Sequence, residues 1–239
     1  MHNREVMSDD EKKRYQTAIL RIAKDEPTQY VVGKAPFFGR TFVVNQDVLI
    51  PESETEDLIE WVLQEMPQDQ PLRVLDLGTG SGVIGITLSL ECPRWRVTLS
   101  DISAGALRVA TANQRLHGTN LRTVESDLFT HLQGERFDLI VTNPPYISPN
   151  ATELIDRAVI KYEPPLALFA SENGLGFYHR LFDQVQDHLT EQGVLFGETG
   201  FDQEESIQRL FTKMQPGATI ETKHDIADRM RMIKAWDFN

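Results

Sequence analysis

The sequence predicts an α/β fold, in which a mixed, mostly parallel β-sheet carries helices on both faces. Three observations support this prediction. From residue 72 onward, short apolar runs of strand length alternate with amphipathic stretches of helix length. A glycine-rich turn directly follows the first of these runs. The last two apolar runs are separated by a turn region that is too short for a parallel crossover, so we expect them to pair antiparallel.

The first 27 residues predict a single short helix. Ser8 and Glu11 have the spacing of a capping box, which marks a helix start. Pro27 then ends the helical pattern. Between these signals, apolar side chains recur at helical spacing, namely Tyr15, Ala18, Ile19 and Ile22.

Residues 28–50 differ in character from the helix before them. Residues 30–33 and 37–44 are rich in aromatic and β-branched side chains, with Gly39 inside the second run. This pattern predicts a β-hairpin. We therefore divide the chain into a short N-terminal helical segment at residues 1–27, a hairpin linker at residues 28–50 and a main domain at residues 51–239.

A second predicted helix follows the hairpin. Ser53 and Glu56 again have capping-box spacing. Two prolines within residues 67–71 indicate a linker that ends this helix. Five apolar residues share one face of it: Leu58, Ile59, Val62, Leu63 and Met66.

Alternating strands and helices then fill the rest of the chain. Strands are expected at residues 72–77, 96–100, 121–125, 137–142 and 194–199, followed by two β-like stretches at residues 218–223 and 230–236. Helices are expected at residues 82–91, 103–116, 174–190 and 203–213, with Gly118 and Gly193 closing the second and the third. Together these elements predict a seven-stranded mixed sheet, in which five parallel strands are followed by an antiparallel pair.

The composition limits the class of protein. The 239 residues include 24 Lys and Arg against 36 Asp and Glu, and the net charge of −12 argues against direct nucleic-acid binding. No apolar run approaches the roughly 20 residues that span a bilayer, and the first residues lack the apolar segment of a secretory signal. A single cysteine, Cys92, excludes an intramolecular disulfide and is typical of the cytoplasm. We expect it to be a buried small side chain.

A cofactor site is predicted at the glycine-rich turn. In an open α/β sheet, ligands bind beside the carboxyl ends of the strands, where glycines let the backbone approach a ligand. Asp101 follows the second strand and can accept hydrogen bonds from ribose hydroxyls. These features fit NAD and S-adenosylmethionine alike, since residues 80–85 also match the dinucleotide fingerprint. The residues of the turn that we expect to bind the cofactor are Gly78, Thr79, Gly80, Ser81 and Gly82.

Two further strand ends favour S-adenosylmethionine. Asp127 and Leu128 follow the third strand, where a carboxylate can accept from an adenine amino group and an apolar side chain can cover the ring. The tetrapeptide Asn-Pro-Pro-Tyr at residues 143–146 follows the fourth strand, at the same edge of the sheet. The first strand is followed by glycines, the second and the third by an acid, and the fourth by this tetrapeptide. This combination predicts a methyltransferase site.

An amide acceptor explains the residue types of the tetrapeptide. An amide nitrogen is a poor nucleophile because its lone pair is delocalised into the carbonyl. The side-chain oxygen of Asn143 and the backbone carbonyl of Pro144 can each accept one N–H bond, which fixes the nitrogen and favours the charge that it gains. Pro145 stiffens the loop, and Tyr146 offers a flat face to the planar acceptor. We therefore expect Asn143, Pro144 and Tyr146 to act in catalysis, with neither a metal nor a covalent intermediate.

With these motifs in place, the chain resembles the HemK/PrmC family of N5-glutamine methyltransferases, which modify the Gly-Gly-Gln motif of peptide-chain release factors. The resemblance runs from about Gln29 to the C-terminus. It rests on segments that match in the same order: QYVVGKAPFFGRTFVVNQDVLIPESETE, DLGTGSG, SDLF, NPPYI and YEP, followed by Ala167-Leu168 and Asn173-Gly174-Leu175. This combination is more specific than NPPY, which amino-methylating DNA enzymes share.

The resemblance implies the Rossmann-like fold of class I S-adenosylmethionine-dependent methyltransferases, with S-adenosylhomocysteine as the product. It implies that residues 78–82 contact the methionine portion of the cofactor, Asp101 the ribose and residues 127–128 the adenine. Asn143 is implied to bridge cofactor and substrate, while residues 144–146 complete the glutamine pocket. The implied partner is a release factor, and the implied role is to tune translation termination in the cytoplasm.

Two departures from the family leave alternatives open. Family members often read PRPETE where this chain reads PESETE at residues 51–56, so an arginine and a proline are missing. Residues 52–56 are then either an acidic helix start or part of the substrate site. The N-terminal segment is also shorter than the family's helical bundle, which helps to grip the release factor. The alternative functions are glutamine methylation of a ribosomal protein, amino methylation of nucleic acid, a nicotinamide oxidoreductase and a catalytically silent cofactor-binding module.

Overall fold

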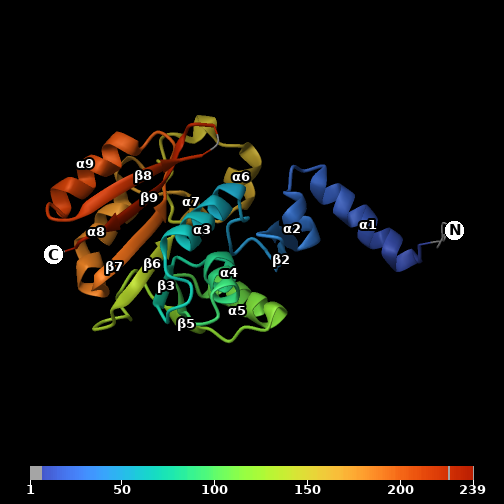
Figure 1. Ribbon diagram of the computed structural model, residues 1–239. Helices are drawn as coiled ribbons and strands as arrows, with labels where there is room; N and C mark the ends of the chain where they lie inside the picture. The colour runs from blue at the N-terminus through green and yellow to red at the C-terminus, as the bar shows by residue number, and fades with distance from the viewer. Residues whose placement is uncertain (1–6, 226, 239) are drawn as a thin grey trace.

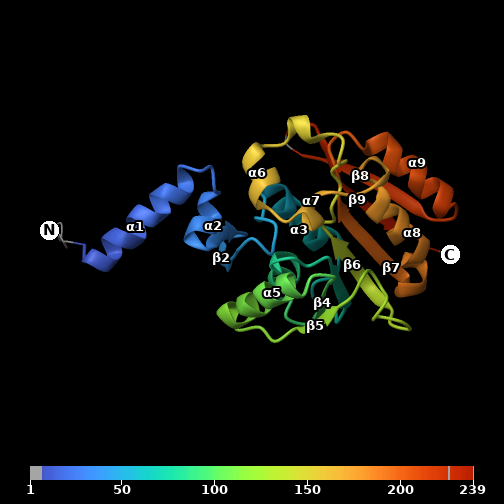
Figure 2. The same cartoon turned by 180° about the vertical axis from the view of Figure 1, so that it is seen from behind.

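The computed structural model describes residues 7–225 and 227–238. Its centre is a seven-stranded sheet with helices on both faces (Figures 1 and 2). The strands of this sheet are β3 (Arg73–Leu77), β4 (Arg96–Asp101), β5 (Arg122–Glu125), β6 (Phe137–Thr142), β7 (Leu189–Glu198), β8 (Thr219–His224) and β9 (Met230–Trp236). The helices that cover it are α3 (Ser53–Glu65), α4 (Val83–Glu91), α5 (Ala104–His117), α8 (Gly176–His188) and α9 (Glu204–Met214).

The strand order in the sheet is β5-β4-β3-β6-β7-β9-β8. The first five strands in this order run parallel to one another. β9 runs antiparallel to both of its neighbours, β7 and β8. The mixed sheet with a terminal antiparallel pair is therefore confirmed.

Side chains alternate between two hydrophobic layers, one on each face of the sheet. Within β6, Leu139 and Val141 belong to the layer under α3, α4 and α5, whereas Ile140 belongs to the layer under α8 and α9. The same alternation in β3 places Val74 in the first layer and Leu75 in the second. β3 and β6, in the middle of the parallel part, are almost wholly buried and consist mainly of apolar residues, whereas the edge strand β5 is mostly exposed.

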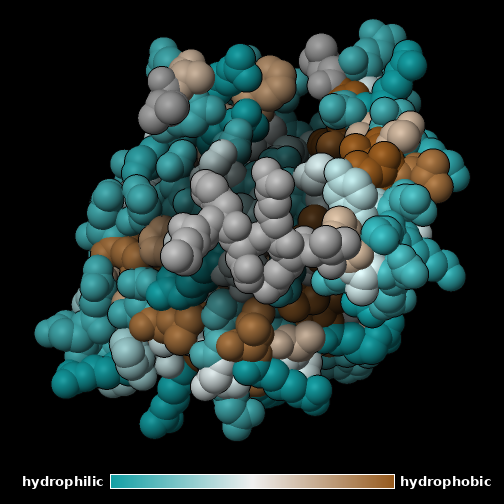
Figure 3. Space-filling view, turned by 90° about the vertical axis from the view of Figure 1, so that its right-hand side faces the viewer, coloured by the Kyte–Doolittle hydropathy of each residue, from teal (hydrophilic) through white to brown (hydrophobic). Residues whose placement is uncertain are grey.

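The N-terminal helix α1 (Asp9–Ile22) extends away from the sheet (Figure 1). The predicted capping box is confirmed, because the Ser8 hydroxyl accepts from the Glu11 N–H and the Glu11 carboxylate accepts from the Ser8 N–H. None of the helix residues is buried. Viewed from this side, the molecule is mostly hydrophilic with scattered hydrophobic groups (Figure 3). The large apolar side chains that α1 exposes are Tyr15, Ile19, Leu20 and Ile22.

The predicted hairpin is present, but its first part folds differently. The two strands are β1 (Lys34–Phe37) and β2 (Arg40–Val43). The prediction of a strand at residues 30–33 is wrong, because Thr28–Val32 form the short helix α2. Within this helix Tyr30 is buried, and its hydroxyl donates to the carbonyl oxygen of Val48 at 2.5 Å. Periodicity does not separate helix from strand over so short an apolar run.

The helix predicted after the hairpin is α3, but its predicted capping box is wrong. Glu52 is the N-cap residue, and no side chain caps the helix. The Glu56 carboxylate instead accepts from the backbone N–H of Phe38, in the turn of the hairpin, at 2.8 Å. Glu56 thus binds a residue of the hairpin and not the N-terminus of its own helix, and this hydrogen bond connects α3 to the hairpin.

The region between β6 and β7 also differs from the prediction. The helix expected at residues 174–190 is α8, which ends at His188, so Gly193 does not close it. β7 already begins at Leu189, which pairs with Phe137 of β6. The sequence pattern did not predict the short elements before α8, which are η1 (Thr152–Leu154), α6 (Arg157–Tyr162), α7 (Pro165–Leu168) and η2 (Glu172–Gly174).

Two simpler expectations concern Cys92 and membrane-spanning helices. Cys92 is buried at the C-cap of α4, as expected for a small apolar side chain. Across residues 7–225 and 227–238, no helix combines the length and the apolar character needed to cross a membrane.

Candidate active site

A cavity of about 330 Å³ lies along the carboxyl ends of the parallel strands, a volume within the range of small-molecule sites. Its walls come from the loops after β3, β4, β5 and β6, from the start of α3 and the segment before it, and from the region of α7 and α8. Most residues of the predicted site line this cavity, namely Gly78, Thr79, Gly80, Ser81, Asp101, Asp127, Leu128, Asn143 and Pro145.

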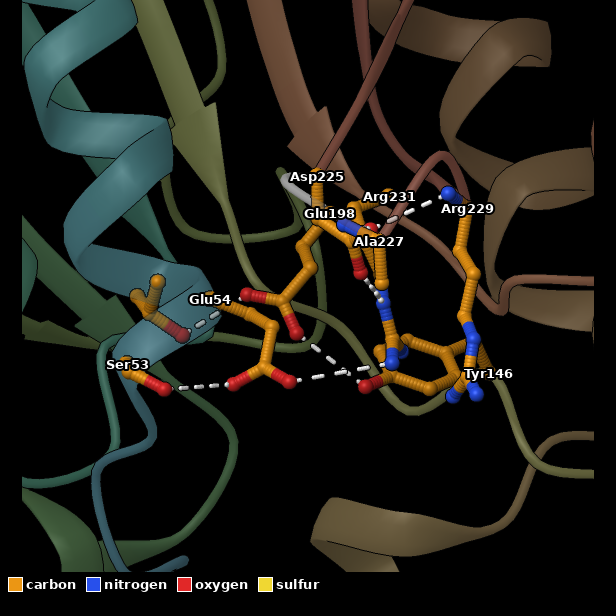
Figure 4. A network of polar contacts seen from close by, with 9 residues as sticks. Ser53, Glu54, Tyr146, Glu198, Asp225, Ala227, Arg229 and Arg231 are labelled. Atoms are coloured by element: carbon orange, nitrogen blue, oxygen red, sulfur yellow. Dashed lines mark hydrogen bonds and ion pairs between the residues drawn. The ribbon is translucent and has the colours of Figure 1, made fainter.

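Gly82, Pro144 and Tyr146 are not among the residues that line the cavity. Gly82 is the N-cap of α4 with a φ of 85°, and a side chain there would meet Ile86 and Ala110. Glycine at this position therefore serves the close packing of α4 against α5. The Tyr146 side chain is directed toward Glu198 instead of the cavity (Figure 4).

A buried carboxylate holds the glycine-rich turn. Asp76, in β3, accepts from the Thr79 hydroxyl at 2.5 Å and from the backbone N–H of Gly85 at 2.8 Å. Burial raises the pKa of Asp76 to about 7. Gly78 and Gly80 have φ values of 74° and 56°, in the left-handed region that favours glycine. The turn therefore offers backbone to the cavity without an intervening Cβ at these two positions.

Asp101, at the end of β4, joins the second strand to this turn. Its Oδ2 accepts from the N–H of Gly80 and its Oδ1 from the N–H of Ser103, both at 2.8 Å. These two bonds fix the carboxylate at the cavity wall, where its side chain is largely buried. Each carboxylate oxygen has a further lone pair. Asp101 can therefore still accept from a ribose hydroxyl.

The predicted adenine site contains an additional charged residue. Arg180, on α8, donates to Asp127 Oδ2 at 2.8 Å, and both residues line the cavity. An adenine amino group would share this carboxylate with Arg180. Leu128 has a φ of 47° and belongs to the hydrophobic layer under α8, together with Phe129. Leu128 thus lies both in the core and at the cavity wall.

A chain of hydrogen bonds runs from Asn143 into the protein interior. Asn143 Nδ2 donates to Thr55 Oγ1 at 2.9 Å, and Thr55 Oγ1 donates to Glu198 Oε2 at 2.7 Å. The Tyr146 hydroxyl donates to the other oxygen, Glu198 Oε1, at 3.0 Å (Figure 4). Thr55 lies in the first turn of α3, Asn143 and Tyr146 follow β6, and Glu198 ends β7. Three separate elements therefore meet at one buried carboxylate.

Charged side chains surround this carboxylate. Burial raises the pKa of Glu198 to about 7, and the negative charge of Glu52 acts in the same direction, while the hydrogen bonds to Glu198 oppose the rise. Arg231, on β9, lies next to the network (Figure 4). Its guanidinium is 3.2 Å from the carboxylate of Asp225 and 3.7 Å from that of Glu54. The acceptor side of the site is thus acidic, with Arg231 as a nearby cation.

The backbone after β6 is held from two sides. Gln203 Nε2 donates to the carbonyl oxygen of Tyr146 at 2.9 Å. Gly174, which has a φ of 90°, lies against the same carbonyl, and a Cβ at this position would collide with it. The tetrapeptide is therefore anchored by the loop before α8 and by the residue that precedes α9.

Thr55, Glu198 and Arg180 are polar residues of this site that the sequence motifs did not identify. Thr55 lies within PESETE, a segment in which the acidic residues are the distinctive feature. Glu198 ends a strand at the ligand edge of the sheet, and an acid at that place is the same signal that identified Asp101. Arg180 lies on the partly exposed side of a helix, where no spacing marks it as functional.

The sequence matches two protein families along its length. Residues 1–33 match the PrmC N-terminal domain, and residues 58–161 match the methyltransferase small domain. A release factor glutamine methyltransferase from Enterococcus faecalis is 38% identical over 235 residues, which cover 98% of this chain and 84% of that protein. The release factor glutamine methyltransferase from Lactococcus lactis is 40% identical over 230 residues, with coverage of 96% and 84%.

Solved structures share the same fold. A methyltransferase from Pyrococcus furiosus superposes with a TM-score of 0.63 at 14% identity, over 95% of this chain and 100% of that one. A 16S rRNA methyltransferase from T. thermophilus, in complex with AdoMet and guanosine, has a TM-score of 0.62 at 18% identity, over 85% and 49% of the two chains. These structures show the class I methyltransferase fold, whereas the near-full-length relatives show the family. The chain belongs to the family of PrmC/HemK release factor glutamine methyltransferases.

Proposed function

We propose that this protein transfers a methyl group from S-adenosylmethionine to the side-chain amide nitrogen, N5, of the glutamine in the Gly-Gly-Gln motif of release factors, and thereby tunes translation termination. The observation that carries this proposal is that Asn143 lines the same cavity as the glycine-rich turn. A residue able to hold an amide thus adjoins the place where the cofactor binds. The family supplies the release factor as the partner.

The residues of the cavity fit S-adenosylmethionine. Backbone at Gly78 and Gly80 is free to approach a ligand because no Cβ covers it. We assign residues 78–82 to the methionine portion of the cofactor, with Gly82 acting through the packing of α4. Asp101 is assigned to the ribose and residues 127–128 to the adenine. S-adenosylhomocysteine is then the product that leaves this cavity.

The tetrapeptide holds the acceptor. When bound, the cofactor supplies a methyl group on a sulfonium, which the substrate nitrogen takes up as the N–C bond forms and the C–S bond breaks. The Asn143 side-chain oxygen and the Pro144 carbonyl accept the two N–H groups of the substrate amide and stabilise the positive charge on its nitrogen. Pro145 lines the cavity, and Tyr146 supports the loop through its hydrogen bond to Glu198. The nitrogen then loses one proton to water.

We further propose a division of labour along the chain. Residues 51–239 carry catalysis, residues 28–50 link the two parts, and residues 1–27 contact the release factor. The linker adds to the site itself, since Asp47, Val48 and Leu49 line the cavity. Because release factors act on ribosomes, we place the protein in the cytoplasm.

The proposal is tested by transfer in vitro. The purified protein is incubated with S-adenosylmethionine and a release factor, and the digested release factor is analysed by mass spectrometry. The expected result is one added methyl group on the glutamine of Gly-Gly-Gln, and none when that glutamine is replaced by alanine. Methylation of DNA, RNA or a ribosomal protein with the release factor left unmodified would contradict the proposal.

A further inference from the structure

We propose that Thr55 and Glu198 are positioning residues for the methyl acceptor: they hold the Asn143 amide so that its oxygen, and not its NH₂ group, faces the substrate. This inference deepens the proposed function and rests on it. It concerns two residues that lie on other elements than the tetrapeptide, namely the first turn of α3 and the end of β7.

The direction of each hydrogen bond follows from the chemistry of the groups. A carboxylate only accepts, so the Thr55 hydroxyl gives its single proton to Glu198. The Thr55 oxygen then has only lone pairs to offer to Asn143, and it receives an N–H from the amide. Since the NH₂ branch of the amide is bound to Thr55, the oxygen branch of Asn143 is the one left for the acceptor.

Burial makes this choice of orientation strong. Thr55 is 2% exposed and Glu198 is 0% exposed, so water does not offer them alternative partners. The second oxygen of Glu198 accepts from Tyr146, which restrains rotation of the carboxylate. A reversed Asn143 amide would place its oxygen against a hydroxyl oxygen that has no proton left to share. The reversed state would therefore lose a hydrogen bond and bring two lone pairs together.

The orientation matters because the substrate amide is a donor. Its NH₂ group needs acceptors at two places, which the proposed function assigns to the Pro144 carbonyl and the Asn143 side chain; of these two residues, Asn143 lines the cavity. If the Asn143 NH₂ group faced the substrate, it would oppose the substrate NH₂ group, and two donors do not form a hydrogen bond. The side-chain amide of asparagine has nearly the same shape in both orientations, so shape alone does not select the correct one.

The same chain of bonds links the orientation to the charge of Glu198. A protonated Glu198 can donate to Thr55, which frees the Thr55 proton for the Asn143 oxygen and lets the amide reverse. Burial raises the pKa of Glu198 to about 7, so this change lies in an accessible pH range. The titratable and charged groups that face Glu198 are Glu52 and Glu54 at the start of α3, Tyr146 after β6, Tyr178 on α8 and Arg231 on β9.

The test compares two replacements of Thr55 with a matched control. Thr55→Val keeps the shape of the side chain and removes the hydroxyl, whereas Thr55→Ser keeps the hydroxyl. Thr87→Val is the control, because Thr87 is a fully buried threonine of α4 whose hydroxyl has no partner within the described part of the chain. For each protein, kcat, KM for the release factor and the dissociation constant of S-adenosylmethionine are measured, with kcat followed across the pKa of Glu198.

Thr55→Val is expected to lower kcat roughly 10-fold, the effect of one misplaced hydrogen bond, with KM and cofactor affinity changed by less than about 3-fold. Thr55→Ser and Thr87→Val are expected to keep kcat within about 3-fold of wild type. In the wild type and in Thr55→Ser, kcat falls as the pH falls through about 7, since Glu198 becomes protonated. Asp76 and Glu163, whose pKa values burial also raises to about 7, titrate in every variant. Thr55→Val therefore shows a smaller step than the wild type and Thr55→Ser, and a merely structural role of Thr55 would not reduce it.

A Thr55→Val protein with wild-type kcat, or equal losses in Thr55→Val and Thr55→Ser, would overturn the positioning role. If Thr55→Val does not fold, Glu198→Gln replaces it, and a pH step as large as that of the wild type in that variant would overturn the role as well. A wild-type protein that methylates no release factor removes both proposals. An active wild type with an unimpaired Thr55→Val removes only the positioning role, so the two failures are distinguishable.

Discussion

Replacing Glu198 by glutamine removes a titrating group from the protein interior and keeps its shape. The pKa of Glu198 is raised from 4.5 to about 7, chiefly by burial. Between these two values the unfolded chain has lost the proton while the folded protein keeps it, so the stability of the wild type falls as the pH rises through this window. At 1.36 kcal/mol per pH unit, the loss that Glu198 contributes is about 3 kcal/mol. Glu198→Gln does not share this loss.

Urea unfolding of both proteins at about pH 4 and about pH 8 measures the effect. Relative to the wild type, Glu198→Gln is expected to gain about 3 kcal/mol on going from the acidic to the alkaline condition. Asp76 and Glu163 also have pKa values raised to about 7 by burial, but they titrate in both proteins and cancel in the comparison. If the two proteins show the same dependence of unfolding free energy on pH, the buried charge of Glu198 is not the cause, and the reasoning is refuted.

Three further replacements test the site and its support. Asn143→Ala should leave the dissociation constant of S-adenosylmethionine within a few-fold and lower turnover by roughly 10²-fold, the scale of one lost polar group at a developing charge; an unchanged turnover would show that Asn143 does not hold the acceptor. Asp101→Asn should weaken cofactor binding by roughly 10-fold in calorimetric titration, because a charged acceptor is lost, and unchanged binding would remove the ribose assignment. Gly174→Ala should lower the free energy of unfolding by about 1–3 kcal/mol, because its φ of 90° and the Tyr146 carbonyl leave no room for a Cβ. Gly217→Ala, where nothing lies within 4 Å, is the control that should not show this loss.

The central strands of the sheet could be predicted because they are buried on both faces, as β3 and β6 show. β6 is mainly apolar, and in β9 Arg231 and Lys234 alternate with apolar residues; both strands begin and end at the predicted residues because turn or loop residues bound them on both sides. The start of β7 is not predictable from the apolar pattern, for a physical reason. The residues between His188 and Val194 are partly polar and include Gly193, so they read as a helix end, yet Leu189 pairs with Phe137 and extends the strand. Backbone hydrogen bonds to a neighbouring strand do not depend on apolar side chains, so the apolar pattern does not predict this part of β7.

Predictions from short sequence patterns are wrong where a contact with a distant residue decides the local structure. Ser53 and Glu56 have the spacing of a capping box, but Glu56 binds the hairpin instead, as its hydrogen bond to Phe38 shows. Residues 30–33 have the composition of a strand, but burial of the Tyr30 ring favours a helical turn there. Each of these choices depends on residues distant in the sequence, and no window of neighbouring residues contains that information.

The candidate site divides in the same way. The residues that follow β3, β4, β5 and β6 could be predicted, because parallel strands bring their carboxyl ends to one edge. Thr55 and Glu198 could not be paired from sequence, since 143 positions separate them and only the docking of α3 beside β7 joins them. The role of Arg180 could not be predicted for the same reason, because only the packing of α8 brings it within hydrogen-bond distance of Asp127.

The place of β9 in the sheet has a consequence for biogenesis. β7 pairs with β6 on one edge and with β9 on the other, and β9 begins only at Met230, so it is synthesised later. Until those later residues leave the ribosome, residues 195–198 of β7 lack the strand with which they pair, and their unpaired N–H and C=O groups form the kind of edge that recruits foreign strands. Glu198 itself pairs with Met232 across that edge. A nascent chain halted before β9 therefore exposes this edge and leaves Glu198 without its neighbour in the sheet.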